Sequence, residues 1–313
     1  MKHLDKFAFA GMVSCSAPSN NNIGYFSPTV IHTEIEAGQI SVQSKIEVRE
    51  NGCLCSNNKG FQIGVVNPNS GHLHPGTITV NANAWIGHIG DKKGVVMHLG
   101  KDADGTLVLN GGRALFAKGD ILGHAGVISR IEINGGVMEA GSITLNNPRS
   151  SIRMRHGGLN TGNIEGGFKI WIYGGIMLVQ GHLHAGPVNL TGMGALVLAG
   201  KKKLCSSLIE GPGLNFVGNG GAVIVPIHTT GGMLSQTYEA EAFFDDLMKQ
   251  GKIMRDGIPI SDFSDFHLEK LLGKNRKSYA ALKPSTPHAG KYQAIAETLR
   301  TLLYGNTKQK YDL

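Results

Sequence analysis

A short pattern recurs along the middle of this chain: two apolar residues one position apart, then a glycine pair, then a second β-like stretch that ends in glycine. Its copies read LVLNGGRALFAKG at 107–119, IEINGGVMEAG at 131–141, a weaker IRMRHGGLNTG at 152–162, and IWIYGGIMLVQG at 170–181. Counted from the first glycine of each pair, the intervals are 24, 22 and 17 residues. Intervals of this length are typical of solenoids, whose repeats bury their apolar faces by stacking on one another.

Apolar residues occupy every second position just before the glycine pairs. Ile131 and Ile133, like Ile170 and Ile172, show the period of two expected of a strand with one buried face. The glycine pairs lie where the chain would turn out of a strand, a place that accepts positive φ. A β-sandwich or propeller would need a hairpin signal between every pair of strands. We therefore predict an all-β fold, a parallel β-helix (β-solenoid).

The last part of the chain has a different pattern. Glycines become rare after about residue 236, and Glu239–Gln250 carries apolar residues at helical spacing, with Gly251 in the C-cap position. A second amphipathic helix is expected at 291–304. Its apolar positions are Tyr292, Ile295, Leu299, Leu302 and Leu303. Because an open solenoid end exposes unpaired backbone, we expect these helices to cover that end or pack against the side of the stack.

Three regions follow from these patterns. Residues 1–30 form an N-terminal segment that contains a degenerate export signal: two lysines, a short apolar run at 7–13, then small residues. Residues 31–235 form the glycine-rich β-solenoid. Residues 236–313 form an α-helical C-terminal appendage that caps the solenoid. Since no stretch approaches 18 apolar residues, no membrane span is expected. The signal predicts an extracellular or cell-surface location.

Paired histidines are the candidate metal ligands. Gly71-His72-Leu73-His74-Pro75-Gly76 and Gly181-His182-Leu183-His184-Ala185-Gly186 nearly repeat one another. A His-x-His pair in a strand directs both imidazoles to one side, a geometry used for zinc, iron or copper. The pairs lie 110 residues apart, however, so solvent-facing strand histidines are the competing interpretation. Further histidines that could extend a pH-responsive surface stripe are His88, His98, His124 and His156.

Catalytic chemistry finds little support in the sequence. Polysaccharide lyases and glycoside hydrolases on a β-helix need paired carboxylates or an acidic calcium cluster. Glu132 and Asp120 are the acids within clear repeat copies that stacking could bring together, and most other acids are expected in turns. The sequence lacks a nucleophile elbow, a phosphate-binding Gly-Lys-Ser/Thr loop and a His-Glu-x-x-His helix. We therefore assign no catalytic residue and no cofactor.

The positive charge does not indicate nucleic-acid binding. The formal net charge is +7, but the basic residues are scattered, and the three lysines at 201–203 form the only tight run. A run of three lysines is more often a solvated turn than a binding patch. No nucleic-acid partner is therefore expected.

The Asn-Gly-Gly turns at 110–112 and 134–136, together with FFDDLMKQGKIMRDGIPISDFSDF at 243–266, resemble glycine-rich β-solenoid surface proteins of bacteria. These include autotransporter passenger domains and proteins with a PEP-CTERM sorting tail. The resemblance implies a non-enzymatic structural or adhesive protein that is secreted or displayed on the cell surface, self-associates as a homo-oligomer and contacts polysaccharide. One alternative is a polysaccharide lyase or glycoside hydrolase with a groove lined by Trp85 or Trp171. A phage or virus fibre component is the other.

Overall fold

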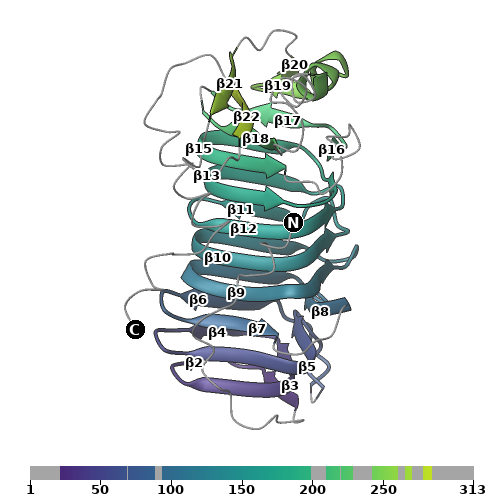
Figure 1. Cartoon of the computed structure of the whole chain (residues 1–313). Coiled ribbons are helices and arrows are strands. Elements are labelled where there is room, and N and C mark those ends of the chain that lie inside the picture. Colours follow the sequence, from purple (N-terminus) through teal and green to yellow (C-terminus); the bar gives the residue numbers. More distant parts are fainter. Residues whose placement is uncertain are drawn as a thin grey trace, which may run out of the picture.

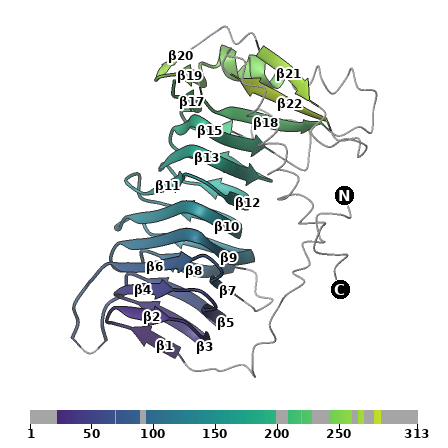
Figure 2. The same ribbon diagram turned by 90° about the vertical axis from the view of Figure 1, so that its left-hand side faces the viewer.

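The computed structural model describes residues 22–68, 70–88, 94–198, 209–218, 220–227, 242–259, 265–269 and 278–283. Within these residues almost every element is a β-strand, and most neighbouring strands pair in parallel. Figures 1 and 2 show the strands stacked one above another along a single axis, with the N-terminal strands at one end and β17–β22 at the other. The prediction of an all-β, parallel-stranded protein is therefore confirmed.

Three series of parallel strand pairs run along the stack, and we term them faces A, B and C. Face A consists of β2 (Thr29–Ile31), β4 (Lys45–Val48), β6 (Gly76–Asn81), the first parts of β9 (Gly105–Gly123) and β10 (Ser129–Leu145), β11 (Ser151–Met154), the first parts of β13 (Lys169–Val179) and β15 (Val188–Leu198), β17 (Leu214–Phe216) and β19 (Ile253–Arg255).

Face B consists of the first parts of β3 (Glu34–Val42) and β5 (Cys53–Ile63), β7 (Trp85–His88), the middle of β9 and β10, the first part of β12 (Gly158–Glu165), the second parts of β13 and β15, and β18 (Ala222–Ile227). Face C consists of β1 (Asn22–Tyr25), the ends of β3 and β5, β8 (Gly94–Leu99), the ends of β9, β10 and β12, β14 (Leu183–His184) and β16 (Ile209–Glu210). One segment from each face makes a level of the stack.

A ladder of aliphatic side chains fills the centre of the stack. On face A, Ile131 pairs with Leu107 before it and Ile152 after it, and Ile152 pairs with Ile170. These side chains are fully buried and belong to one continuous core cluster. Between them and the next inward positions lie outward residues such as Glu132, which confirms the period of two. Each level therefore buries its apolar side chains only because the levels above and below complete the core.

A column of glycines forms the corner between faces A and B. Gly111, Gly136, Gly157 and Gly175 have φ of +96°, +84°, +86° and +79°, as expected for the turn out of each face-A strand. Strand residues recur here at intervals of 24, 21 and 18, whereas the glycine pairs recur at 24, 22 and 17. The one-residue differences arise because the third copy has one more residue than the others between its strand and its glycine pair. The left-handed residue is the first glycine of the pair at Gly111 and Gly157, and the second at Gly136 and Gly175. Either glycine of a pair can therefore take the left-handed position.

A short helix at 242–249 lies at the C-terminal end of the stack. Phe243, Phe244 and Leu247 are buried and belong to the central core cluster, so this helix covers the open end of the core. Its C-terminus is a Schellman motif, because Gly251 N donates to Met248 O and Lys252 N donates to Leu247 O, each at 2.9 Å. Gly251 has φ +64°, as its predicted C-cap role requires.

The C-terminal region, expected to be mainly α-helical, also contains strands. β20 (Ile258–Pro259) pairs antiparallel with β19, β22 (Ser278–Lys283) pairs antiparallel with β18, and β21 (Asp265–Glu269) pairs antiparallel with β22. At the other end, the stack starts earlier than the solenoid boundary expected at residue 31, because β1 lies before that residue and β2 ends at it. The export signal and the helix expected at 291–304 lie outside the described residues. No described helix is long and apolar enough to cross a membrane.

Candidate functional site

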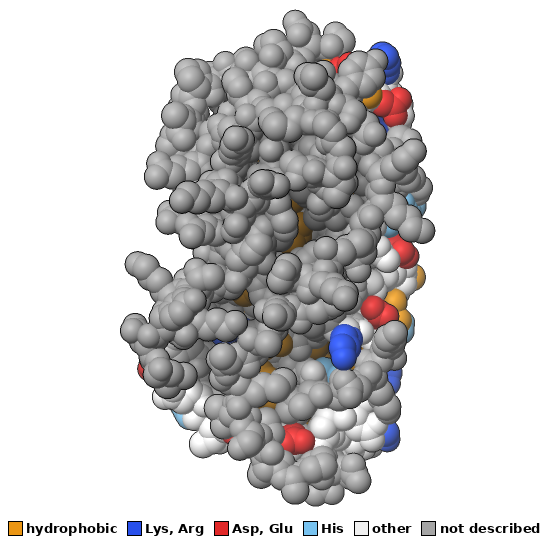
Figure 3. All heavy atoms as spheres, viewed as in Figure 1, with side chains coloured by type: hydrophobic (Ala, Val, Ile, Leu, Met, Phe, Trp, Pro, Cys, Tyr) orange, Lys and Arg blue, Asp and Glu red, His pale blue; other side chains and the backbone are white. Residues whose placement is uncertain are grey.

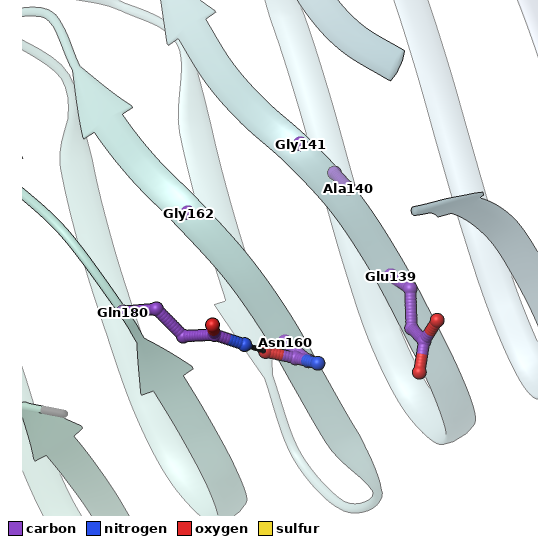
Figure 4. Close-up of a pocket in the computed structure, with 6 residues that line it drawn as sticks. All are labelled: Glu139, Ala140, Gly141, Asn160, Gly162 and Gln180. Atoms are coloured by element: carbon purple, nitrogen blue, oxygen red, sulfur yellow. Dashed lines mark hydrogen bonds between the residues drawn. The ribbon is translucent and has the colours of Figure 1, made fainter. Parts of the chain in front are cut away.

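A pocket opens at the corner between faces B and C, where three successive levels meet. It is lined by Glu139, Ala140, Gly141, Asn160, Gly162 and Gln180, and Figure 4 shows the three polar side chains on neighbouring strands. A second column of glycines forms this corner, and at Gly162 a Cβ would overlap the carbonyl oxygen of Gly141. Because these glycines carry no side chains, the space beside the polar residues stays open.

The polar groups of the pocket are a carboxyl and two amides. Gln180 Nε2 donates a hydrogen bond of 2.7 Å to Asn160 Oδ1. Burial raises the pKa of the Glu139 carboxyl above its ordinary value, because the charged form is desolvated. The two amides can donate and accept hydrogen bonds, and the carboxyl accepts them when ionised. Glu139 lies within β10 and faces outward beside the glycine corner, and it is not among the residues that the sequence singled out as candidates.

The two acids that the sequence singled out lie on different faces. Glu132 pairs with Val108 and Arg153 on face A, and Asp120 pairs with Ser142 on face C. Ser142 Oγ donates a hydrogen bond of 2.7 Å to Asp120 Oδ1. The suggestion that stacking would bring these two carboxylates together is wrong, because stacking joins equivalent positions of successive levels and these positions are not equivalent.

The two tryptophans also lie on different faces. Trp85 is on face B, paired with Cys53 and Arg113, whereas Trp171 is on face A. The rings of Trp171 and Tyr173 are nearly parallel, with centroids 5.6 Å apart and an interplanar angle of 10°. Since Tyr173 is 41% exposed, this pair forms an aromatic surface on face A. Because they lie on different faces, the two tryptophans are separate candidates for ligand contact.

The two His-x-His pairs remain apart. The rings within each pair have centroids 6.2 Å apart, both for His72 with His74 and for His182 with His184. The first pair follows the end of β5, and the second lies at β14, five levels further along face C, or about 24 Å at the usual strand spacing. Among the described residues no group of three or more His, Cys, Asp or Glu side chains could hold a metal ion.

Another histidine pair forms through stacking. His98 Nδ1 and His124 Nε2 are 3.0 Å apart, and the two rings are stacked with centroids 5.3 Å apart. Burial lowers the pKa of His98, and the nearby charges of His124 and Lys101 lower it further. His88, in contrast, lies on face B, so the histidines do not form a single stripe. His98 and His124 are 26 residues apart in the sequence, and they meet because His98 pairs with Leu122, two residues before His124.

No family model matches this chain, and neither a curated protein nor a solved structure matches it.

Proposed function

We propose that the stack is a parallel β-solenoid with three strand segments per turn, and that it serves as a rigid structural or adhesive protein, secreted or displayed on the cell surface. The observation that carries this proposal is the set of three parallel series, each running through nine or more strand segments with one common core. A rod of this kind presents repeated outer surfaces and is rigid, because its levels share one continuous core. The resemblance to bacterial surface solenoids supports the same role.

The alternative architecture is a closed barrel, because the strand pairs also form rings. Those rings arise where one long strand bends round the corners: β9 pairs with β6, β7 and β8 in turn, one on each face. Partner residues along a face are separated by one complete circuit of the chain, for example Leu107 and Ile131. A solenoid accounts for both features, since successive circuits lie on top of one another.

Self-association through the N-terminal end is part of this proposal. In the described part of the chain, β1 pairs only with β3 and β2 only with β4, so each presents an outer edge with unpaired backbone. Arg49 N donates to Ile31 O at 2.9 Å, so the backbone groups of Ile31 face β4 and those of Val30 face the outer edge. An open parallel edge is a template for pairing with a second chain.

Light scattering at increasing protein concentration tests this self-association. We expect assemblies larger than a monomer in the wild type and a smaller average mass for Val30→Pro, because proline removes an N–H from the outer edge but none from the pairing with β4. Val30→Thr is the matched control and should assemble as the wild type does. A wild type that stays strictly monomeric would contradict the assembly, and a stable trimer would favour the fibre alternative.

One observation favours the polysaccharide-cleaving alternative. The Asp120 carboxylate lies beside Gly141, with Oδ1 3.2 Å from the position that a Cβ would take, and Gly141 lines the pocket that contains Glu139. Glu139 and Asp120 would be the two carboxyl groups that glycoside hydrolysis requires. A screen of acidic and neutral polysaccharides distinguishes the enzyme from the structural protein. Cleavage that is lost in both Glu139→Gln and Asp120→Asn would establish an enzyme. Absence of cleavage would leave the structural role.

A further inference from the structure

The outer side of face B is apolar over the last three levels before the cap. The outward positions there are Ile176 and Leu178 of β13, Ala195 and Val197 of β15, and Ala222 and Ile224 of β18. We term these six residues the face-B patch. They alternate with the inward residues Met177, Leu196 and Val223, which belong to the central core cluster, whereas the patch residues do not.

The other two faces carry aromatic or polar side chains at the corresponding outward positions. On face A, the stacked Trp171 and Tyr173 are followed by Asn189 and then Asn215. The side chains of Asn189 and Asn215 are joined by a hydrogen bond of 2.9 Å. On face C the outward positions include Glu165 and His184. An exterior of aliphatic side chains alone is therefore particular to face B over these levels. Its six residues are at most 1% exposed, so this sheet surface is covered rather than open to solvent.

We propose that the face-B patch is the docking surface for the amphipathic helix expected at 291–304 of this same chain. That segment has 14 residues, which as a helix would extend about 21 Å, whereas three levels of strands span about 14 Å. Its apolar positions fall on one side of a helix, with Leu299 at the centre and Glu297 and Thr301 on the opposite side. The helix would bury its apolar side against the patch and leave its polar side in solvent.

The path of the chain places this segment beside the patch. β22 pairs with β18, the last strand of the patch, so that Leu282 lies beside Val223, and β22 ends at Lys283. Only the seven residues 284–290 then separate Lys283 from the expected helix, and their extended length of about 23 Å spans the whole patch. In Figure 1 the ends of β13 and β15 face the viewer, and Figure 3 shows hydrophobic side chains in the middle of the same view.

The competing occupants fit less well. Residues 1–21 are long enough to reach the patch from β1, since 21 extended residues span about 69 Å, but their apolar run at 7–13 is only half as long as the 14-residue expected helix. A second copy of the chain would have to bring its own aliphatic surface, and the outward positions of its faces A and C over these levels carry aromatic or polar side chains. Residues 199–208 and 228–241 also adjoin the patch, because they follow β15 and β18. The expected helix at 291–304 is the segment that carries an apolar stripe of matching length.

Thiol accessibility at Val197 tests the docking in the full-length chain. The four native cysteines, at 15, 53, 55 and 205, are first replaced by alanine, and Val197→Cys is introduced. We expect this thiol to react with a maleimide far more slowly than the thiol of Arg153→Cys, an exposed position on face A. Adding Leu299→Asp to Val197→Cys should raise the rate at which this thiol reacts at least about tenfold. The reason is that the docked helix loses the free energy gained by burying one leucine side chain. Adding Thr301→Asp should leave the rate unchanged.

Three outcomes would overturn the proposal. A thiol at 197 that reacts as fast as the one at 153, in a chain with an unchanged β-sheet circular dichroism spectrum, would show that the patch is open. Equal protection with Leu299→Asp and Thr301→Asp would show that another segment covers it, and release by Phe9→Asp would identify residues 1–21. Protection that disappears on dilution would indicate a second copy. The result does not depend on the proposed surface role, so either can fail without the other.

Discussion

Replacing Gly136 with alanine should destabilise the stack by about 3 kcal/mol. This glycine has φ +84°, and a left-handed conformation costs about 1–2 kcal/mol for alanine. A Cβ at Gly136 would overlap the carbonyl oxygen of Gly112 and lie 2.8 Å from Gly111 C, and these backbone atoms of the preceding level cannot rotate away. Overpacking of this kind adds about 1–3 kcal/mol to the destabilisation. The lower conformational entropy of the unfolded alanine variant offsets about 0.4–1 kcal/mol of it.

Three other glycines separate these contributions. Gly71 has φ +71° and open space around it, so Gly71→Ala should show the conformational cost alone, about 1 kcal/mol. Gly162→Ala meets the Gly141 carbonyl without positive φ, and should show the steric cost alone. Gly126 has neither constraint, so Gly126→Ala should be neutral or stabilising by up to about 1 kcal/mol.

Urea unfolding followed by far-ultraviolet circular dichroism measures all four variants. The free energies of unfolding should rank Gly126→Ala highest and Gly136→Ala lowest. If Gly136→Ala were no less stable than Gly71→Ala, close contact between successive levels at this corner would be refuted, and with it the stacking that the register describes. An unchanged slope of unfolding free energy against urea concentration is needed for the comparison.

Two pH-dependent effects follow from the titratable groups. Burial raises the pKa of Glu139 in the folded protein above the ordinary 4.5, so wild-type stability falls as pH rises from that value through the folded pKa. Glu139→Gln should therefore be more stable than the wild type in urea at pH 7, and its advantage should shrink at pH 4; an equal difference at both pH values would argue against a desolvated carboxyl. The folded pKa of His98 is lowered below 6.5, so stability is lost as pH falls from 6.5 toward the folded pKa. His98→Gln should flatten this slope, His156→Gln should not, and an NMR titration of His98 with a midpoint above 6.5 would contradict the assignment.

Local sequence rules were enough for the strands and their inward faces. Ile131, Ile133, Ile170 and Ile172 are fully buried, as their period of two predicted. Gly251 was equally predictable, because a left-handed C-cap is a property of the helix end and needs no distant contact. Which glycine of each pair becomes left-handed was not predictable, since it depends on bulges that shift the register between whole levels.

The candidate site was hidden for a related reason. Glu139, Asn160 and Gln180 are separated by about 20 residues each, and their common position follows only from aligning β10, β12 and β13 through their backbone hydrogen bonds. Changes in the length of each circuit move residues between equivalent and non-equivalent positions. Asp120 and Glu132 do not meet because they lie within one circuit on different faces, whereas His98 pairs with Leu122 and so meets His124 two residues further along.

The order of apolar and glycine residues along the chain, by itself, determined that this protein forms short strands with one buried side and sharp turns between them, because both properties are set within a few residues. Only the tertiary structure decided which outer side chains become neighbours, how two glycine columns form the corners, and why one of three outer faces is apolar. Those outcomes depend on the register between successive circuits, and that register is fixed by backbone pairing and core packing across 17 or more residues.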